Sequence, residues 1–189
     1  MPPGRLARWL EGFAERHGEV VFDGAVYRAA DGAVAHVEVP FGPLEGDLVT
    51  HVLRDRTVGV LLARKGGHAA GVFVGDTLVS SKVGSRHVQG RTAAGGWSQQ
   101  RFARRREGQA TVASQAAADV AVRILMAQPL DAVVTGGERS AVADVLADKR
   151  LSALLPLVQP RLLDVPDPRL KVLQAVPFRD VWIRVVDPG

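Results

Sequence analysis

The sequence lacks cysteine altogether and is poor in methionine and tyrosine, with two and one among its 189 residues. Without cysteine, the chain cannot form disulfide bonds, thiolate zinc sites or cysteine nucleophiles. Long hydrophobic runs are missing too: the longest stretch without a charged residue is the eleven positions from Gly108 to Ala118, and a bilayer-spanning helix needs about 20 apolar residues. The first residues, with Arg5, Glu11 and Glu15, do not follow the pattern of a signal peptide. We therefore expect a cytoplasmic globular chain without a membrane span.

Patterns for metal, nucleotide and triad chemistry are also scarce. The five histidines show no ligand spacing such as His-Glu-x-x-His, and neither a Walker A motif nor Gly-x-Gly-x-x-Gly occurs. A Ser-His-Asp site would lack the Gly-x-Ser-x-Gly turn. Gly136-Gly137 precedes a predicted helix, where a phosphate could meet helix amides, but tight packing of strand on helix explains the glycine pair at least as well. We predict no metal site and no cofactor.

Hydrophobic patterns predict an α/β fold in one domain over residues 1–189, with a mixed β-sheet flanked by helices. The expected helices cover residues 3–16, 108 to about 128 before Pro129, 140–149 and about 169–175. The expected strands are hairpin strands within 19–39, broken at Asp23-Gly24 and Asp31-Gly32, a meander of 57–63, 69–74 and 77–81, and strands over 130–135 and 180–186.

Positive charge is concentrated in one segment. Between Lys82 and Glu107 there are seven basic residues and one acid, a charge of +6, so the rest of the chain carries −2 of the total of +4. Residues from about 84 to 107 show no clear hydrophobic period, and loops of that length are usually functional or disordered. We predict a mobile basic loop that projects from the sheet. It either docks on phosphates or is a solvated surface loop, and the clustering favours phosphates.

The stretch from Gln89 to Arg106 contains the most informative residues of the chain. Gly95 and Gly96 allow close approach to a crowded partner, and Trp97 offers a stacking surface. Gln99 and Gln100 supply neutral donors and acceptors that can orient a water molecule. The arginines that can grip phosphates are Arg91, Arg101, Arg104, Arg105 and Arg106. A flexible basic loop with glutamines for solubility would have the same composition.

This stretch resembles the catalytic loop of the eukaryotic and archaeal class I peptide chain release factors, which carries Gly-Gly-Gln followed by Arg-Phe-Ala-Arg. Here Gly95-Gly96 is followed at the same distance by the sequence Arg101-Phe102-Ala103-Arg104. Within that superfamily the chain is most similar to the actinobacterial Vms-like release factors. The resemblance covers about residues 57–149. Without gaps, the release-factor glutamine falls on Trp97, so its role passes to Gln99 or Gln100.

The resemblance implies a peptidyl-tRNA hydrolase that frees nascent peptides from tRNA in stalled ribosome complexes, as part of ribosome rescue. Its partners would be peptidyl-tRNA and the peptidyl transferase centre of the large subunit. Gln99 or Gln100 would be catalytic, together with Gly95 and Gly96. RNA binding would fall to Trp97 and the five arginines named above. The alternatives are a non-catalytic rRNA- or tRNA-binding module and a nuclease, for which the dispersed carboxylates offer little support.

Overall fold

The computed structural model describes residues 1–85 and 98–188, with the backbone alone for residues 98–107 and 110. Its contacts divide the chain into two compact units: unit 1 is Met1–Arg54 with Pro177–Gly189, and unit 2 is Asp55–Val176. Each unit has its own sheet. The sequence predicted one domain because of its length, and length alone does not show whether the strands join one sheet or two.

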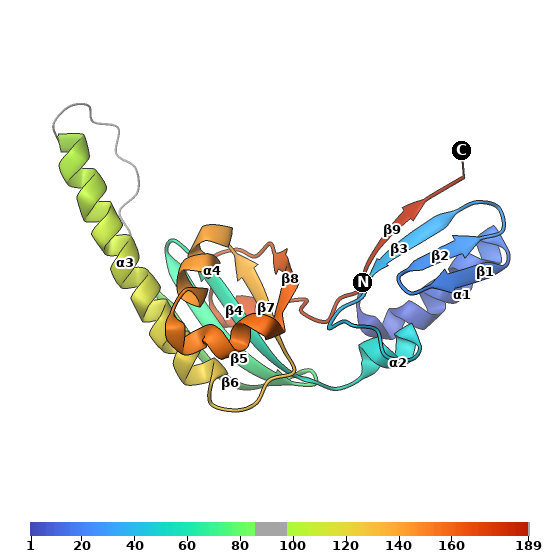
Figure 1. Ribbon diagram of the computed structural model, residues 1–189, viewed down its shortest axis with the longest axis horizontal. Helices are drawn as coiled ribbons and strands as arrows, with labels where there is room; N and C mark the ends of the chain where they lie inside the picture. Colours follow the sequence, from blue (N-terminus) through green and yellow to red (C-terminus); the bar gives the residue numbers. More distant parts are fainter. Residues whose placement is uncertain (86–97, 189) are drawn as a thin grey trace. The chain divides into compact units, whose positions relative to one another are not determined.

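The sheet of unit 1 is antiparallel, with the strand order β1-β2-β3-β9 (Figure 1). Its strands are β1 (Val20–Asp23), β2 (Val26–Ala29), β3 (Val34–Glu38) and β9 (Trp182–Val186). The first three form the hairpins expected at Asp23-Gly24 and Asp31-Gly32, and the turn glycines Gly24 and Gly32 have φ of 63° and 95°. The last strand returns from far along the chain to pair with β3.

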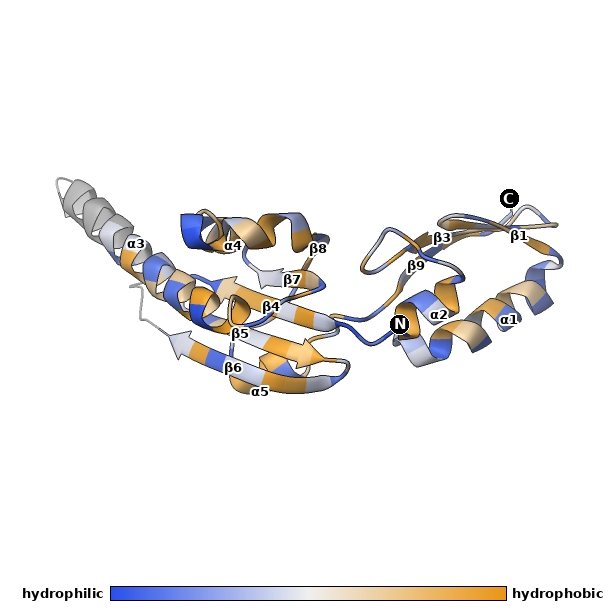
Figure 2. Cartoon of the chain, turned by 60° about the horizontal axis from the view of Figure 1, so that its bottom comes forward, coloured by the Kyte–Doolittle hydropathy of each residue, from blue (hydrophilic) through white to orange (hydrophobic). Residues whose placement is uncertain are grey.

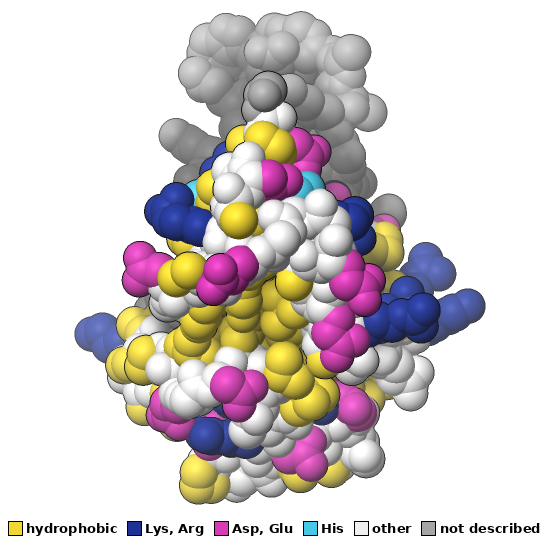
Figure 3. All heavy atoms as spheres, turned by 90° about the vertical axis from the view of Figure 1, so that its right-hand side faces the viewer, with side chains coloured by type: hydrophobic (Ala, Val, Ile, Leu, Met, Phe, Trp, Pro, Cys, Tyr) yellow, Lys and Arg dark blue, Asp and Glu magenta, His cyan; other side chains and the backbone are white. Residues whose placement is uncertain are grey.

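Two helices pack on one face of this sheet (Figure 2). Helix α1 (Leu6–His17) follows the short 3-10 helix η1 (Pro3–Arg5), as expected, and buries Leu6 and Phe13. The short helix α2 (Leu48–Leu53) was not expected. Asp47 caps it by accepting a hydrogen bond from the backbone N–H of Thr50 at 3.0 Å. Some hydrophobic side chains of unit 1 still reach its surface, where they lie among Asp and Glu side chains (Figure 3).

The sheet of unit 2 is mixed, in the order β6-β5-β4-β7-β8. Strands β4 (Thr57–Arg64), β5 (Gly67–Val74) and β6 (Thr77–Ser85) form the expected antiparallel meander. Strands β7 (Ala132–Gly137) and β8 (Val158–Leu163) run parallel to β4. The predicted α/β class with a mixed, helix-flanked sheet is confirmed, although the sequence analysis missed β8.

Helices cover both faces of this sheet. Helix α3 (Ser98–Leu125), α4 (Arg139–Leu146) and the 3-10 helix η2 (Lys149–Leu157) bury the main core with residues such as Leu61, Val72 and Val133. The short helix α5 (Leu170–Gln174) packs from the other side, where Leu173 fills the space left by Gly71. No helix in the described part of the chain is long and apolar enough to span a bilayer.

Candidate functional site

In the part of helix α3 whose side chains the structure describes, the buried residues lie in the C-terminal half. Its buried residues begin at Ala117 and continue through Ala121 to Leu125, all on the main core of unit 2. Towards its N-terminus, Gly108, Thr111 and Val112 are exposed, and the helix extends beyond the edge of the sheet (Figure 1). A helix rises about 1.5 Å per residue, so its first turn lies roughly 25 Å along the axis from the first buried residue.

The predicted site residues fall on this extending part of α3. Six of them lie in its first three turns: Gln99, Gln100, Arg101, Arg104, Arg105 and Arg106. The other four, Arg91, Gly95, Gly96 and Trp97, lie outside the described residues. The glutamine pair and the arginine cluster therefore share one rigid element, and its N-terminal end carries the positive end of the helix dipole.

The predicted loop over about residues 84–107 is wrong at its C-terminal end. Strand β6 continues to Ser85, and α3 begins at Ser98 instead of near Gly108. Ten residues assigned to the loop are thus helical. The hydrophobic period failed to reveal them because Phe102 and Ala103 are the only apolar residues among the ten, so the sequence shows no apolar stripe. Intrinsic propensity gave the missing signal, since Gln, Arg, Ala and Glu are all good helix formers.

The segment that leads to the site leaves the sheet at the edge where its parallel strands end. In the ladder, Ser85 at the end of β6 pairs with Gly67, which pairs with Arg64 at the end of β4. Arg64 links this edge to the chain after β8, because its Nη1 donates a hydrogen bond to the carbonyl oxygen of Val165 at 2.7 Å. Its guanidinium also lies 3.9 Å from the carboxylate of Glu138. Arg64 therefore links β4 to Val165 and Glu138 at the edge where β6 ends.

Gly136 and Gly137 end strand β7 instead of forming a turn. A Cβ on Gly136 would lie 2.9 Å from the side chain of Leu62, and one on Gly137 would collide with the carbonyl of Ala63. Gly137 also has φ of 103°, a conformation that L side chains rarely adopt. Close packing on β4 accounts for both glycines. The glycine pair is therefore no longer an argument for a phosphate site at this position.

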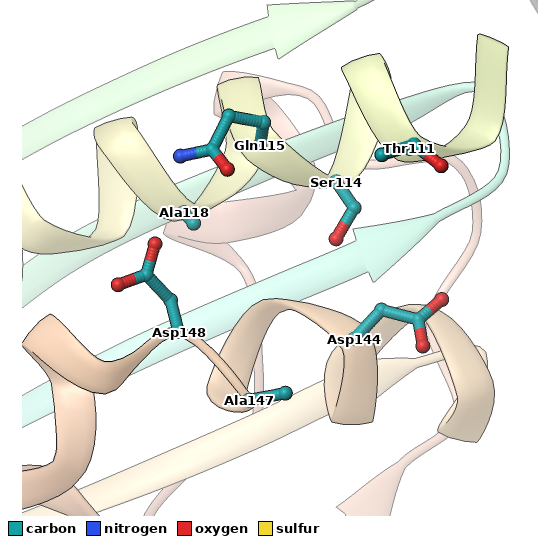
Figure 4. A pocket seen from close by; sticks show the side chains of 7 residues that line it. All are labelled: Thr111, Ser114, Gln115, Ala118, Asp144, Ala147 and Asp148. Carbon is teal, nitrogen blue, oxygen red and sulfur yellow. The ribbon is translucent and has the colours of Figure 1, made fainter. Parts of the chain in front are cut away.

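A groove of about 490 Å³ separates α3 from α4 (Figure 4). Its lining is polar and small: Thr111, Ser114, Gln115, Ala118, Asp144, Ala147 and Asp148. At its end, Nη2 of Arg150 lies 2.7 Å from Asp119 on α3 and 2.7 Å from Asp148. The hydrogen bonds from Arg150 lower the pKa of Asp148 to about 2 and lower that of Asp119. These ion pairs help to hold the packed half of α3 in place. No motif in the sequence predicts them.

The described residues contain no group of three or more His, Asp or Glu that could hold a metal ion. The predicted site residues at the start of α3 belong to residue types with neutral amide and guanidinium groups, and the helix start adds backbone N–H groups. Such groups bind phosphates and can orient water, and they stabilise developing negative charge.

An α/β unit with a long helix carrying a glutamine pair and an arginine cluster has the makeup of a release-factor-like protein. A comparison with protein-family models matches residues 56–186 to the family described as Actinobacteria/chloroflexi VLRF1 release factor. The chain belongs to this family, because the match covers well over half of it. Membership gives it a release-factor-like role associated with the ribosome. A comparison with curated proteins found no match.

Proposed function

We propose that the chain is a cytoplasmic peptidyl-tRNA hydrolase that acts on the large ribosomal subunit and frees nascent peptides from tRNA in stalled complexes. The observation that carries this proposal lies inside the matched range: Gln99 and Gln100 occupy the first turn of a helix that extends away from its own core. Such a helix can reach a substrate held by another macromolecule, as the peptidyl transferase centre holds peptidyl-tRNA.

The reaction is transfer of the peptidyl group to water. The water oxygen attacks the ester carbonyl carbon, and the bond from that carbon to the ribose oxygen of tRNA breaks. The tRNA hydroxyl leaves with a proton, and the peptide leaves as a carboxylate after losing one. A glutamine is too weak a base to take the proton, so its role is to orient the water by hydrogen bonds. Ribosomal RNA supplies the remaining polar groups around the transition state.

The start of α3 is suited to the negative charge that develops on the carbonyl oxygen. The first four N–H groups of a helix have no partner within the helix. Here they belong to the turn that contains Gln99 and Gln100, and the dipole of the 28-residue helix adds positive potential. Backbone N–H groups of this kind stabilise tetrahedral intermediates in other acyl-transfer sites.

The arginines position the helix on RNA. Arg101, Arg104, Arg105 and Arg106 lie within two turns of the glutamines, so phosphates that they bind would lie within about 10 Å of the ester along the axis. Gly95 and Gly96 precede the helix in sequence and would permit close approach to the crowded centre. The arginines that bind RNA and the glutamine that orients the water thus belong to the same helix.

Peptide release from stalled ribosome complexes tests the proposal. Purified chain is incubated with complexes that carry labelled peptidyl-tRNA, and the products are separated. Released peptide with intact tRNA is the expected result. Shortened tRNA would identify a nuclease, and co-sedimentation without either product would identify the alternative, a non-catalytic RNA-binding module built on the same arginines.

A further inference from the structure

The two units of the chain carry opposite charges. Unit 1 contains seven Lys and Arg against ten Asp and Glu, a net charge of −3. The whole chain carries +4, so unit 2 has a net charge of +7, of which +6 lies in the segment from Lys82 to Glu107. The proposed RNA contacts all lie in unit 2. An acidic unit is repelled by phosphates, so unit 1 is suited to a different partner.

The helix-bearing face of the sheet in unit 1 is covered only at its centre. One row of paired residues crosses all four strands on this face: Phe22, Tyr27, Ala35 and Val185. Ala35 is fully buried under α1, whereas Phe22 is 37% exposed and Val185 is 40% exposed. The row spans about 14 Å at 4.8 Å per strand, and a single helix with its side chains is about 10 Å wide. Apolar side chains are therefore open on both sides of α1.

The side over β1 is the better docking surface because it is aromatic and belongs to the acidic unit. The rings of Phe22 and Tyr27 lie 4.4 Å apart, and Val20 follows on the same face of β1. Burial raises the pKa of the Tyr27 hydroxyl, and the negative charge of Asp47 raises it further, which places a carboxylate near this ring. We call Val20, Phe22 and Tyr27 the β1 strip.

We propose that the β1 strip docks a basic amphipathic helix of a protein partner on the large ribosomal subunit. A helix laid beside α1 would cover the exposed part of Phe22 with its apolar residues, and its Lys and Arg would be attracted by the net negative charge of unit 1. The proposal rests on the proposed ribosomal function and adds a protein contact to its RNA contacts. Charge decides between partners, because the acidic surroundings oppose RNA and anionic lipid and favour a basic protein.

Association with purified large ribosomal subunits, and separately with rRNA extracted from them, tests this contact. Phe22→Lys in the full chain should weaken binding to the subunits by about tenfold or more, as expected for an aromatic anchor at a protein interface, and leave binding to extracted rRNA unchanged. Val21→Lys is the matched control. Val21 is the next residue of the same strand, is 64% exposed and belongs to the opposite face, so this variant should bind like the unmodified chain.

Two further variants separate a loss of the contact from misfolding and test the role of charge. Phe22→Leu keeps the strip apolar and should retain most of the binding. Glu19→Gln combined with Asp23→Asn removes two exposed carboxylates and changes the net charge of unit 1 from −3 to −1, so it should weaken subunit binding at low salt. Stronger binding of that variant would mean an acidic partner and would overturn the proposal. So would equal effects of the Phe22→Lys and Val21→Lys variants, or loss of rRNA binding in the Phe22→Lys variant. Peptide release is measured independently, so a failed hydrolase would leave this result intact.

Discussion

Arg150 joins helix α3 to the segment after α4: its Nη2 donates a hydrogen bond to Oδ1 of Asp119 on α3 at 2.7 Å. The same guanidinium also binds Asp148, the N-cap of η2. The described buried residues of α3 lie in its second half, so these contacts help to hold the part of the helix from which the proposed active segment extends. The ion pairs are largely exposed, and their contribution is therefore sensitive to pH and salt.

The first prediction concerns Arg150→Ala and acid stability. The pKa of Asp148 is lowered from 3.8 to about 2 by hydrogen bonds from Arg150. A carboxylate with a lowered pKa stabilises the fold above its ordinary pKa, and this contribution is lost as the pH falls through the folded-state value. The unmodified chain should therefore lose stability between about pH 4 and pH 2, and the Arg150→Ala variant should lose less over that range. Urea unfolding at a series of pH values measures the difference. Arg139→Ala, an exposed change on α4, is the control and should follow the unmodified chain.

The second prediction concerns Gly137→Ala, which should lower the free energy of unfolding by roughly 1–3 kcal/mol. The new Cβ would meet the carbonyl of Ala63, and the backbone φ of 103° is strained for alanine. Gly66→Ala is the control, because a Cβ there meets nothing within 4 Å. Thermal unfolding of both variants gives the measurement. Equal stability of the two would show that Gly137 is not needed for packing.

Residues with a local signal were well predicted from the sequence, and those without one were not. The helix around Ala117 was found from apolar residues at four-residue steps, and the hairpins of unit 1 from Asp-Gly turns. Pairing of β9 with β3 joins residues about 150 positions apart, and nothing local encodes it. The same holds for the division into two units. The site residues Gln99 and Gln100 were named from their chemistry, but their helical setting was missed because the sequence around them shows no apolar period.

The third prediction tests whether α3 must be continuous. Gly108 lies between the packed half of the helix and the arginines, and a Cβ there meets nothing within 4 Å. Gly108→Ala should stabilise the helix by about 1 kcal/mol and raise the helical circular dichroism signal. Gly108→Pro should break the helix and slow peptide release strongly. Because the buried residues of α3 begin at Ala117, the melting temperature should change little. Full release by the proline variant would contradict the role of α3 as a rigid carrier.

The fourth prediction concerns the arginine cluster. If Arg104, Arg105 and Arg106 each neutralise one phosphate, replacing all three by alanine should reduce the log-log salt slope of rRNA binding by about 2, at roughly 0.7 per contact for single-stranded RNA. Binding measured by fluorescence anisotropy over a range of salt concentrations gives this slope. Arg123→Ala, an exposed change in the last turn of the same helix, should leave it unchanged. An unaltered slope in the triple variant would remove the cluster from the RNA contact.

The fifth prediction separates the two glutamines. Positions 99 and 100 are adjacent in α3, and a helix turns by about 100° per residue, so they cannot face the same direction. One of the variants Gln99→Ala and Gln100→Ala should therefore slow peptide release about a hundredfold or more, as expected when a preorganised group at an acyl-transfer centre is lost. The other should release nearly as fast as the unmodified chain. Both should still bind ribosomes, because the arginines are intact. Single-turnover release with pre-bound complexes separates chemistry from binding. If the double variant releases peptide at the full rate, neither amide orients the water, and the reaction must depend on ribosomal RNA and the helix N–H groups alone.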